Sequence, residues 1–102
     1  MKYFGLIYYV VDSFVSLRGP FRQEHLRLVR EAKHRGELLL AGALGDPADR
    51  ALLVFYSQDR SVAEDFAGSD PYVMNGLVTR WEVQPWAVVT ENGSRTFPSG
   101  AK

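Results

Sequence analysis

Residues 36–57 read GELLLAGALGDPADRALLVFYS, two apolar runs on either side of a short polar segment. The runs Leu38–Leu44 and Ala51–Ser57 have the length of ordinary strands. Residues 45–47 are Gly-Asp-Pro, and each of these residue types favours a turn, through a flexible backbone, a self-bonding side chain and a fixed φ respectively. The sequence therefore predicts a β-hairpin in the middle of the chain.

The segment before the hairpin predicts a strand followed by a helix. Aromatic and β-branched residues dominate Tyr3–Val11, which is typical of a strand, and residues 12–19 are expected to be a connection. Pro20 suits the first helical position because its missing N–H would have no partner there, and Gly36 suits the end. We therefore expect a helix from residue 19 to about Arg35.

The segment after the hairpin predicts a helix followed by a strand. Ser61 and Glu64 have capping-box spacing, so we expect Ser61 to cap a short helix that ends near residue 68. Asp70-Pro71 then begins a further turn or helical step. A fourth strand is expected over residues 77–89.

The resulting order, βαββαβ, predicts an α+β, ferredoxin-like fold in which both helices cover one face of a four-stranded antiparallel sheet. Pro85 cannot donate to a sheet ladder, so the fourth strand should lie at an edge or carry a bulge there. The length of 102 residues fits one domain. We place this domain at residues 1–90 and expect the Gly-, Ser- and Pro-containing residues 91–102 to be a flexible tail.

Composition argues against several classes of function. Acidic and basic residues balance at 12 each, so no nucleic-acid partner is expected. The absence of cysteine excludes disulfides and thiolate ligands, and the two histidines fall on different sides of the first long helix, so neither a metal nor another cofactor is expected. No stretch approaches the length of a membrane span, and the early apolar run stops at Asp12, so we expect no membrane partner and a cytoplasmic protein.

Both faces of the predicted sheet are apolar. On the first strand, one face would carry Phe4, Leu6, Tyr8 and Val10, and the other Tyr3, Ile7, Tyr9 and Val11. On the second strand, Leu38, Leu40 and Leu44 would lie opposite to Leu39, Ala41 and Ala43. On the third strand, Leu52, Val54 and Tyr56 would lie opposite to Leu53 and Phe55. Two helices cover one face only, and the other would exceed the roughly few hundred Å² of apolar patch that monomers tolerate. We predict a homodimer through the helix-free face. The alternative is that the first strand is merely central and the exposed apolar residues are scattered.

His25 lies on the apolar stripe of the first long helix. At about 100° per residue, this stripe also contains Phe21, Leu28, Val29 and Ala32. An imidazole aimed at the core needs a hydrogen-bond partner. It could be a structural histidine, which is the commoner case, or a general acid or base whose tautomer is fixed by that partner.

Asp70 is the candidate partner, because it precedes the strand that returns beside the first strand, under the first long helix. Its role could equally be the ordinary opening of a turn or helix. Arg22, one turn before His25, could bind an anionic group, and Arg18 lies a further turn away. Three aromatic residues, Tyr8, Tyr72 and Trp81, could line a pocket, although packing or solvation is the ordinary role of all these side chains.

Several segments together resemble one known family across about residues 2–90. They are Lys2-Tyr3-Phe4, Pro20-Phe21-Arg22 with His25-Leu26, Gly36 to Pro47, Ala51 to Phe55, Asp70-Pro71-Tyr72-Val73, Asn75 to Val78, Arg80-Trp81, Val83 and Trp86. In this order and spacing they resemble the YCII-related family. The resemblance implies a dimeric α/β-barrel of two ferredoxin-like units and an active-site pair at His25 and Asp70. It also implies kinship with muconolactone isomerase and chloromuconolactone dehalogenase, which act on small unsaturated lactones.

The sequence thus leads to one main functional hypothesis and two others. The first is a cofactor-free enzyme in which His25 and Asp70 perform general acid–base chemistry on a small organic acid or lactone, in an isomerase, lyase or dehalogenase type of reaction. In this hypothesis Arg22, Tyr8, Tyr72 and Trp81 bind the substrate. The others are a small-metabolite-binding module without catalysis and a structural dimerisation domain.

Overall fold

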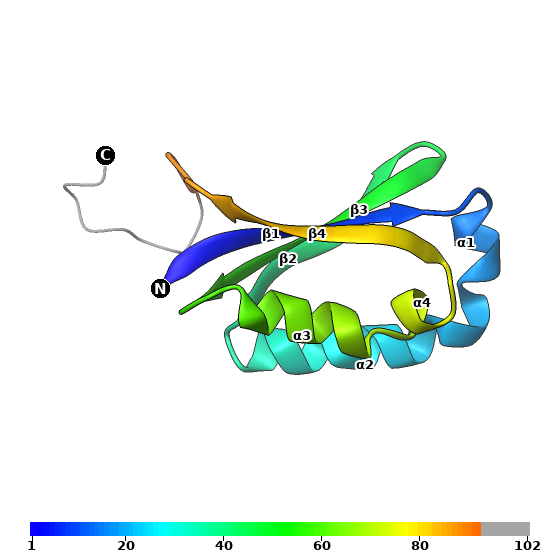
Figure 1. Cartoon of the computed structure of the whole chain (residues 1–102), viewed down its shortest axis with the longest axis horizontal. Coiled ribbons are helices and arrows are strands. Elements are labelled where there is room, and N and C mark those ends of the chain that lie inside the picture. The colour runs from blue at the N-terminus through cyan, green and yellow to red at the C-terminus, as the bar shows by residue number, and fades with distance from the viewer. Residues whose placement is uncertain (93–102) are drawn as a thin grey trace.

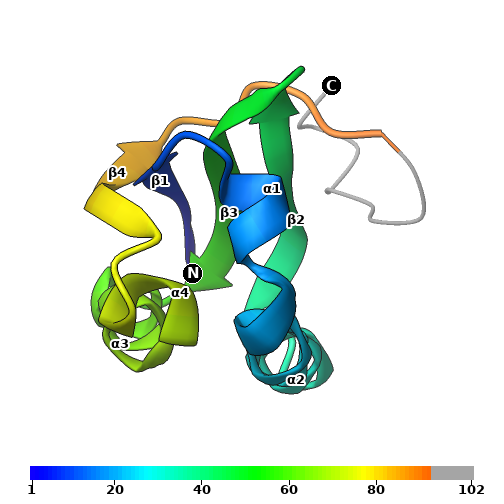
Figure 2. The same cartoon turned by 90° about the vertical axis from the view of Figure 1, so that its right-hand side faces the viewer.

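In a computed structural model of the chain, which describes residues 1–92, four strands form one antiparallel sheet with helices on one side (Figures 1 and 2). The elements are β1 (Lys2–Val10), α1 (Phe14–Leu17), α2 (Gly19–His34), β2 (Leu38–Gly45), β3 (Ala48–Ser57), α3 (Ser61–Ser69), α4 (Pro71–Met74) and β4 (Val78–Trp86). The sheet order is β2-β3-β1-β4. This confirms the predicted α+β, ferredoxin-like class.

Most predicted elements are present with small shifts at their ends. The helix expected from residue 19 to about Arg35 is α2, and the central hairpin consists of β2 and β3. Pro85 lies on β4, an edge strand, opposite Phe4, as its missing N–H requires. The expected connection over residues 12–19 instead contains the one-turn helix α1, anchored by the buried side chain of Phe14.

The predicted cap of α3 is wrong. Arg60, not Ser61, occupies the N-cap position, and its side chain makes no capping bond. The N–H and hydroxyl of Ser61 both donate to Asp59 Oδ1, at 2.9 and 2.6 Å. The carboxylate two residues upstream is a stronger acceptor than the serine hydroxyl, so it takes over the start of the helix.

The core lies between the sheet and the helices. Its strand residues are Phe4, Leu6, Tyr8, Leu53, Phe55 and Val83, and its helix residues include Ala32, Ala63, Phe66, Ala67 and Tyr72. α2 and α3 lie side by side beneath the sheet, and the short α4 leads back to β4 (Figure 1). This arrangement brings residues from β1, α2 and the α3–α4 junction together.

The helix-free face of the sheet is apolar over much of β2, β3 and β1, whereas β4 contributes Arg80, Glu82 and Gln84 to it. One change from the predicted register occurs in β2. The pairing between β2 and β3 shifts between Leu38 and Leu40, so Leu38 enters the core at 4% exposure while Leu40 is 69% exposed. A strict two-residue alternation had placed both leucines on one face, and the bulge separates them.

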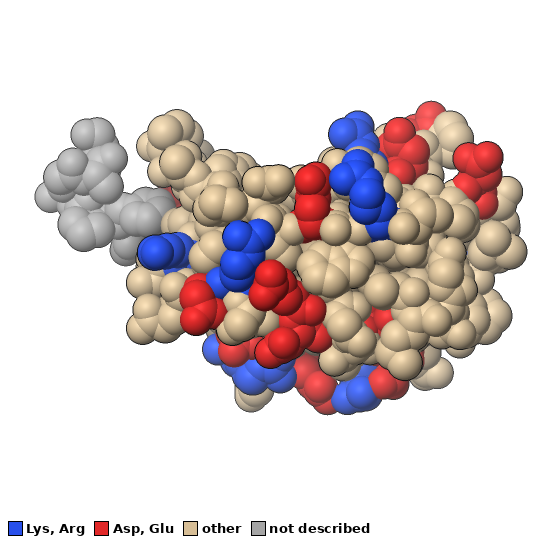
Figure 3. All heavy atoms as spheres, viewed as in Figure 1, with Lys and Arg blue, Asp and Glu red and all other residues tan. Residues whose placement is uncertain are grey.

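Charged side chains are mixed on the surface seen in Figure 3, where Lys and Arg are interspersed with Asp and Glu. None of the helices in residues 1–92 is long and apolar enough to cross a membrane. The predicted flexible tail lies mostly at residues 93–102, outside the described residues.

Candidate active site

The imidazole of His25 is in contact with the carboxylate of Asp70. His25 Nδ1 lies 2.9 Å from Asp70 Oδ2 and 3.0 Å from Oδ1. The His25 side chain is 14% exposed, whereas that of Asp70 is fully buried. α2 holds the imidazole here because Ala32, on the same stripe, is buried against the core. The predicted inward direction of His25 is therefore what the helix packing produces.

Asp70 is held by the start of α4. It is the N-cap of this helix, and its Oδ1 accepts the Tyr72 N–H at 3.0 Å. Pro71 follows at the first helical position, where no N–H is required. The extended backbone of Asp70, with φ −75° and ψ 123°, turns the side chain back toward the helix start and the core.

Tyr8 supplies a further donor to the same carboxylate. Its hydroxyl donates to Asp70 Oδ2 at 2.8 Å, from a side chain that is 1% exposed. Burial raises the pKa of Tyr8 well above its usual value, and the adjacent Asp70 carboxylate raises it further. The buried charge of Asp70 thus has three donors, on His25, Tyr8 and the Tyr72 backbone, which is the condition for keeping a carboxylate in a core.

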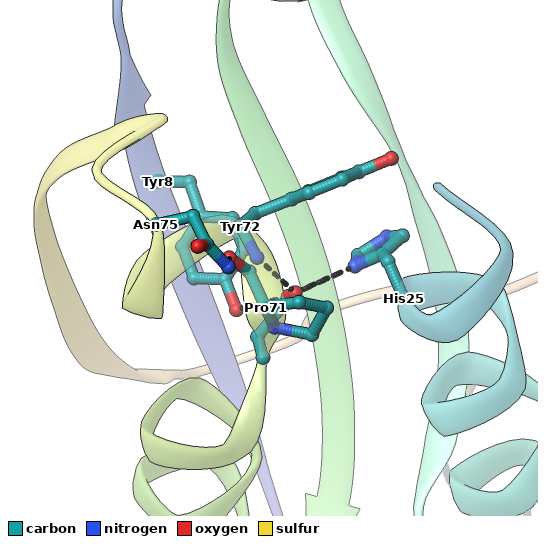
Figure 4. A network of polar contacts seen from close by, with 6 residues as sticks. Tyr8, His25, Pro71, Tyr72 and Asn75 are labelled. Carbon is teal, nitrogen blue, oxygen red and sulfur yellow. Dashed lines mark hydrogen bonds and ion pairs between the residues drawn. The ribbon is translucent and has the colours of Figure 1, made fainter. Parts of the chain in front are cut away.

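This geometry determines the tautomer of neutral His25. Because Asp70 is an acceptor, Nδ1 carries the proton and Nε2 has the free lone pair. The Tyr72 ring stacks on the imidazole at 4.1 Å between centroids and 15° between planes, and Phe66 contacts it edge-on. The close-up in Figure 4 shows His25 and Tyr8 converging on this network from different elements. Packing and hydrogen bonds therefore restrain the ring.

A cavity of about 170 Å³ opens beside His25. Its polar and charged lining comes from Arg18, Arg22, His25, Tyr8 and Tyr72. Small residues of β2, Ala41–Ala43, form part of its wall. The cavity therefore combines an oriented imidazole with two guanidinium groups and two phenols.

The structure brings together most of the predicted site residues. His25, Arg22, Tyr8 and Tyr72 all line the cavity, with Asp70 directly behind the imidazole. Trp81 is not among the described lining residues; it is the β4 partner of Tyr8 and packs against the core. Its place on an edge strand could have shown this, because β4 and the β2 wall of the cavity lie at opposite edges of the sheet.

Two features of the site were not predicted. Arg18 was noticed as a neighbour of Arg22 but not assigned to the site. It is the N-cap of α2, four residues before Arg22, and this spacing of about one helical turn was the available signal. Tyr8 was expected to be a pocket wall and also proves to be a donor to Asp70. Within the described part of the chain, no group of three or more His, Asp or Glu side chains is placed to hold a metal.

Comparison with known proteins gives the family of the chain and a solved structure of similar fold. The YCII-related domain matches residues 1–87. The 5-chloro-2-hydroxyhydroquinone dehydrochlorinase of Burkholderia phenoliruptrix, solved with 2,5-dihydroxybenzoquinone, superposes with a TM-score of 0.67 at 16% identity, over 82% of this chain and 92% of that one. No curated protein matches the sequence. The match over residues 1–87 covers every strand and helix that the structure describes, and the chain belongs to the YCII-related family.

Proposed function

We propose that this protein is a small enzyme in which His25, oriented by Asp70, transfers protons on a small organic acid or lactone. The observation that carries the proposal is the contact between His25 Nδ1 and a fully buried carboxylate, with the imidazole facing a cavity. A buried carboxylate behind an imidazole fixes its tautomer and stabilises the imidazolium that forms during proton transfer.

The chemistry follows from the free Nε2 lone pair. Nε2 takes a proton from a substrate carbon or hydroxyl, and the released electron pair has two possible destinations. It moves within the substrate, after which the imidazolium returns the proton at another carbon and the reaction is an isomerisation. Alternatively, it expels a leaving group as an anion, and the net reaction is an elimination. His25 and Asp70 carry a compensated charge pair while the proton is held.

The solved protein of similar fold supports the elimination branch. It is named as a dehydrochlorinase, and its ligand, 2,5-dihydroxybenzoquinone, is a small ring. A ring of this kind carries oxygen atoms that accept or release protons. We therefore rank elimination from a small cyclic acid or enol as the first reaction to assay, followed by lactone isomerisation.

We further propose that the enzyme works as a homodimer through the helix-free sheet face. Leu40 and Leu44 are 69% and 40% exposed there, beside half-buried Ile7, Leu52 and Tyr56. Pairing two such faces removes this apolar surface from water. Sedimentation of the wild type and of Leu40→Glu tests this: the wild type should be a dimer and the variant a monomer. A monomeric wild type would refute it.

The central experiment compares the two histidines of α2. A panel of small lactones, β-substituted acids and halogenated ring enols is assayed with the wild type, His25→Ala and His34→Ala. We expect His25→Ala to lose about 10²–10⁴-fold in turnover of the accepted substrate. His34, exposed on the same helix, should be replaceable without effect.

Two outcomes would contradict the proposal. Equal turnover by His25→Ala and the wild type would remove the imidazole from the mechanism. Ligand-dependent rises in melting temperature without product from any panel member would favour the binding module instead.

A further inference from the structure

One buried polar atom next to the imidazole has no hydrogen-bond partner. The Tyr72 side chain is 2% exposed, and within residues 1–92 its hydroxyl makes no hydrogen bond. Figure 4 shows the ring beside His25, with the hydroxyl directed away from Pro71. Tyr72 also lines the cavity. An unsatisfied buried hydroxyl is costly, so it requires an explanation.

The position of this hydroxyl is fixed by the ring that carries it. The ring stacks on His25 at 4.1 Å, and Phe14 packs edge-on against it at 5.3 Å and 87°. The Tyr72 backbone N–H is bound by Asp70, which fixes the other end of the residue. The hydroxyl is therefore a preorganised donor beside the imidazole, carried by a residue of the cavity wall.

Two cations lie near the same hydroxyl. Arg18 and Arg22 line the cavity together with Tyr72. Burial raises the pKa of Tyr72, and these two guanidinium groups lower it, Arg22 more strongly than Arg18. Neither arginine has a salt bridge with a described residue, in contrast to Arg27, which is paired with Glu24 and Glu31. No Asp or Glu appears among the described residues of the cavity lining. The Asp70 carboxylate behind His25 offsets one of these two positive charges, and the cavity keeps a net positive charge.

The size of the cavity limits the ligand. Its volume of about 170 Å³ is close to the roughly 150 Å³ of an engineered protein cavity that holds benzene. A single six-membered ring, or an open chain of similar size, fits this volume.

We propose that the cavity is an oxyanion site for a one-ring carboxylate or enolate, which is held by the Tyr72 hydroxyl and the guanidinium groups of Arg18 and Arg22, with its reacting C–H or O–H toward His25 Nε2. This inference rests on the proposed function and names its substrate class. The Tyr72 hydroxyl donates to the substrate oxygen that gains negative charge when His25 removes the proton. The two arginines attract and orient the anion.

The test uses benzoate and benzamide as probes, because they match in size and differ in charge. Binding to the full chain is measured by titration of amide and imidazole NMR signals. We expect benzoate to bind with shifts at His25 and Tyr72 and benzamide to bind at least tenfold more weakly. Equal affinities, or no benzoate binding up to its solubility limit, would overturn the proposal.

Variants then assign the residues. Arg22→Met and Tyr72→Phe should each weaken benzoate binding about tenfold to a hundredfold, the range for hydrogen bonds to a charged group. Arg30→Met, a matched loss of one cation from an exposed position of α2, should have no effect. If Arg22→Met and Arg30→Met weaken benzoate binding equally, the affinity depends only on the overall charge of the protein. This result would overturn the proposal.

The melting temperature of Tyr72→Phe distinguishes a ligand-binding role of the Tyr72 hydroxyl from a structural role. Since the hydroxyl is unpaired, Tyr72→Phe should leave the melting temperature of the free protein unchanged or raise it. A lower melting temperature together with unchanged benzoate affinity would contradict the proposal. Kinetics of His25→Ala and Arg22→Met distinguish the proposed acid–base function from the proposed oxyanion site. If His25→Ala abolishes turnover while Arg22→Met leaves KM unchanged, the acid–base function is supported and the oxyanion site is refuted.

Discussion

The dipeptide Asp-Pro occurs twice in this chain, in two very different surroundings. Asp46-Pro47 forms the turn between β2 and β3, and Asp46 is exposed and has no side-chain hydrogen bond to another described residue. Asp70-Pro71 opens α4, and Asp70 is fully buried, with donors from His25, Tyr8 and the Tyr72 backbone. The local sequence favours a turn or helix start in both places.

The difference between the two aspartates is therefore tertiary. A carboxylate in water needs nothing from the protein, whereas a buried one requires donors that the fold must supply. Those donors at Asp70 come from β1 and α2, 62 and 45 positions away in the sequence. A short motif becomes a candidate for catalysis only through what the fold packs against it.

The comparison is tested most severely by removing the charge at both sites. In Asp70→Asn, an amide N–H directed at His25 Nδ1 would move the imidazole proton to Nε2 and remove the base. We expect turnover of the accepted substrate to fall about 10²–10⁴-fold. Asp46→Asn should retain wild-type turnover. Equal kcat/KM values for the two variants would make the aspartates functionally equivalent.

The donors at Asp70 should be visible in stability. Tyr8→Phe leaves a buried carboxylate oxygen with one donor fewer, and we expect unfolding in urea to become easier by about 1–3 kcal/mol. Tyr9→Phe is the matched control, because the Tyr9 hydroxyl donates to half-buried Glu82 at 3.2 Å on the other sheet face. If Tyr9→Phe lowers the free energy of unfolding as much as Tyr8→Phe does, the buried hydrogen bond to Asp70 contributes no more to stability than the bond to half-buried Glu82.

Alkaline pH sharpens the same contrast. The pKa of Tyr8 is raised in the folded state above the ordinary 10.0. The stabilisation that this raised pKa gives the folded state is therefore complete below about pH 10. It is lost above this pH, because Tyr8 releases its proton in the unfolded chain and retains it in the folded one. The expected slope is at most about 1.4 kcal/mol per pH unit for this group. Urea midpoints on either side of pH 10 should fall less steeply in Tyr8→Phe, and identical slopes would refute the assignment.

The smallest effect is expected at the exposed turn. Asp46→Ala removes a side chain without a described hydrogen-bond partner, so the free energy of unfolding should change by less than about 0.5 kcal/mol. Turnover should match that of the wild type. A larger loss, measured by the same urea titration, would show that the turn carboxylate has a structural partner after all.

Much of the fold was predictable because periodicity and turn residues agree. The hairpin, the long helix ending near Gly36 and the edge position of Pro85 each have a local physical cause in the sequence. α1 was missed because a single turn has no measurable periodicity. The Leu38–Leu40 bulge and the Asp59 cap depend on one-residue differences in pairing and acceptor strength, which patterns do not resolve.

The sequence was sufficient to predict which helices and strands carry the site residues. The stripe of α2 placed His25 against the core, and the topology placed Asp70 beneath it. The donor role of Tyr8 and the absence of Trp81 from the described lining depend on the position of the side-chain terminus. The sequence pattern predicts only which face of the sheet a side chain lies on. The cytoplasmic location, the dimer and the domain boundary at residue 90 remain predictions.

The Asp70 carboxylate joins the first strand, the first long helix and the segment that leads into the last strand. The proton on His25 Nδ1 is shielded only when these three parts of the chain have come together. A fragment that stops after β3 lacks this acceptor entirely. The NMR resonance of that single proton thus provides a reporter of complete assembly, and it should vanish at the earliest separation of α2 from the rest of the domain.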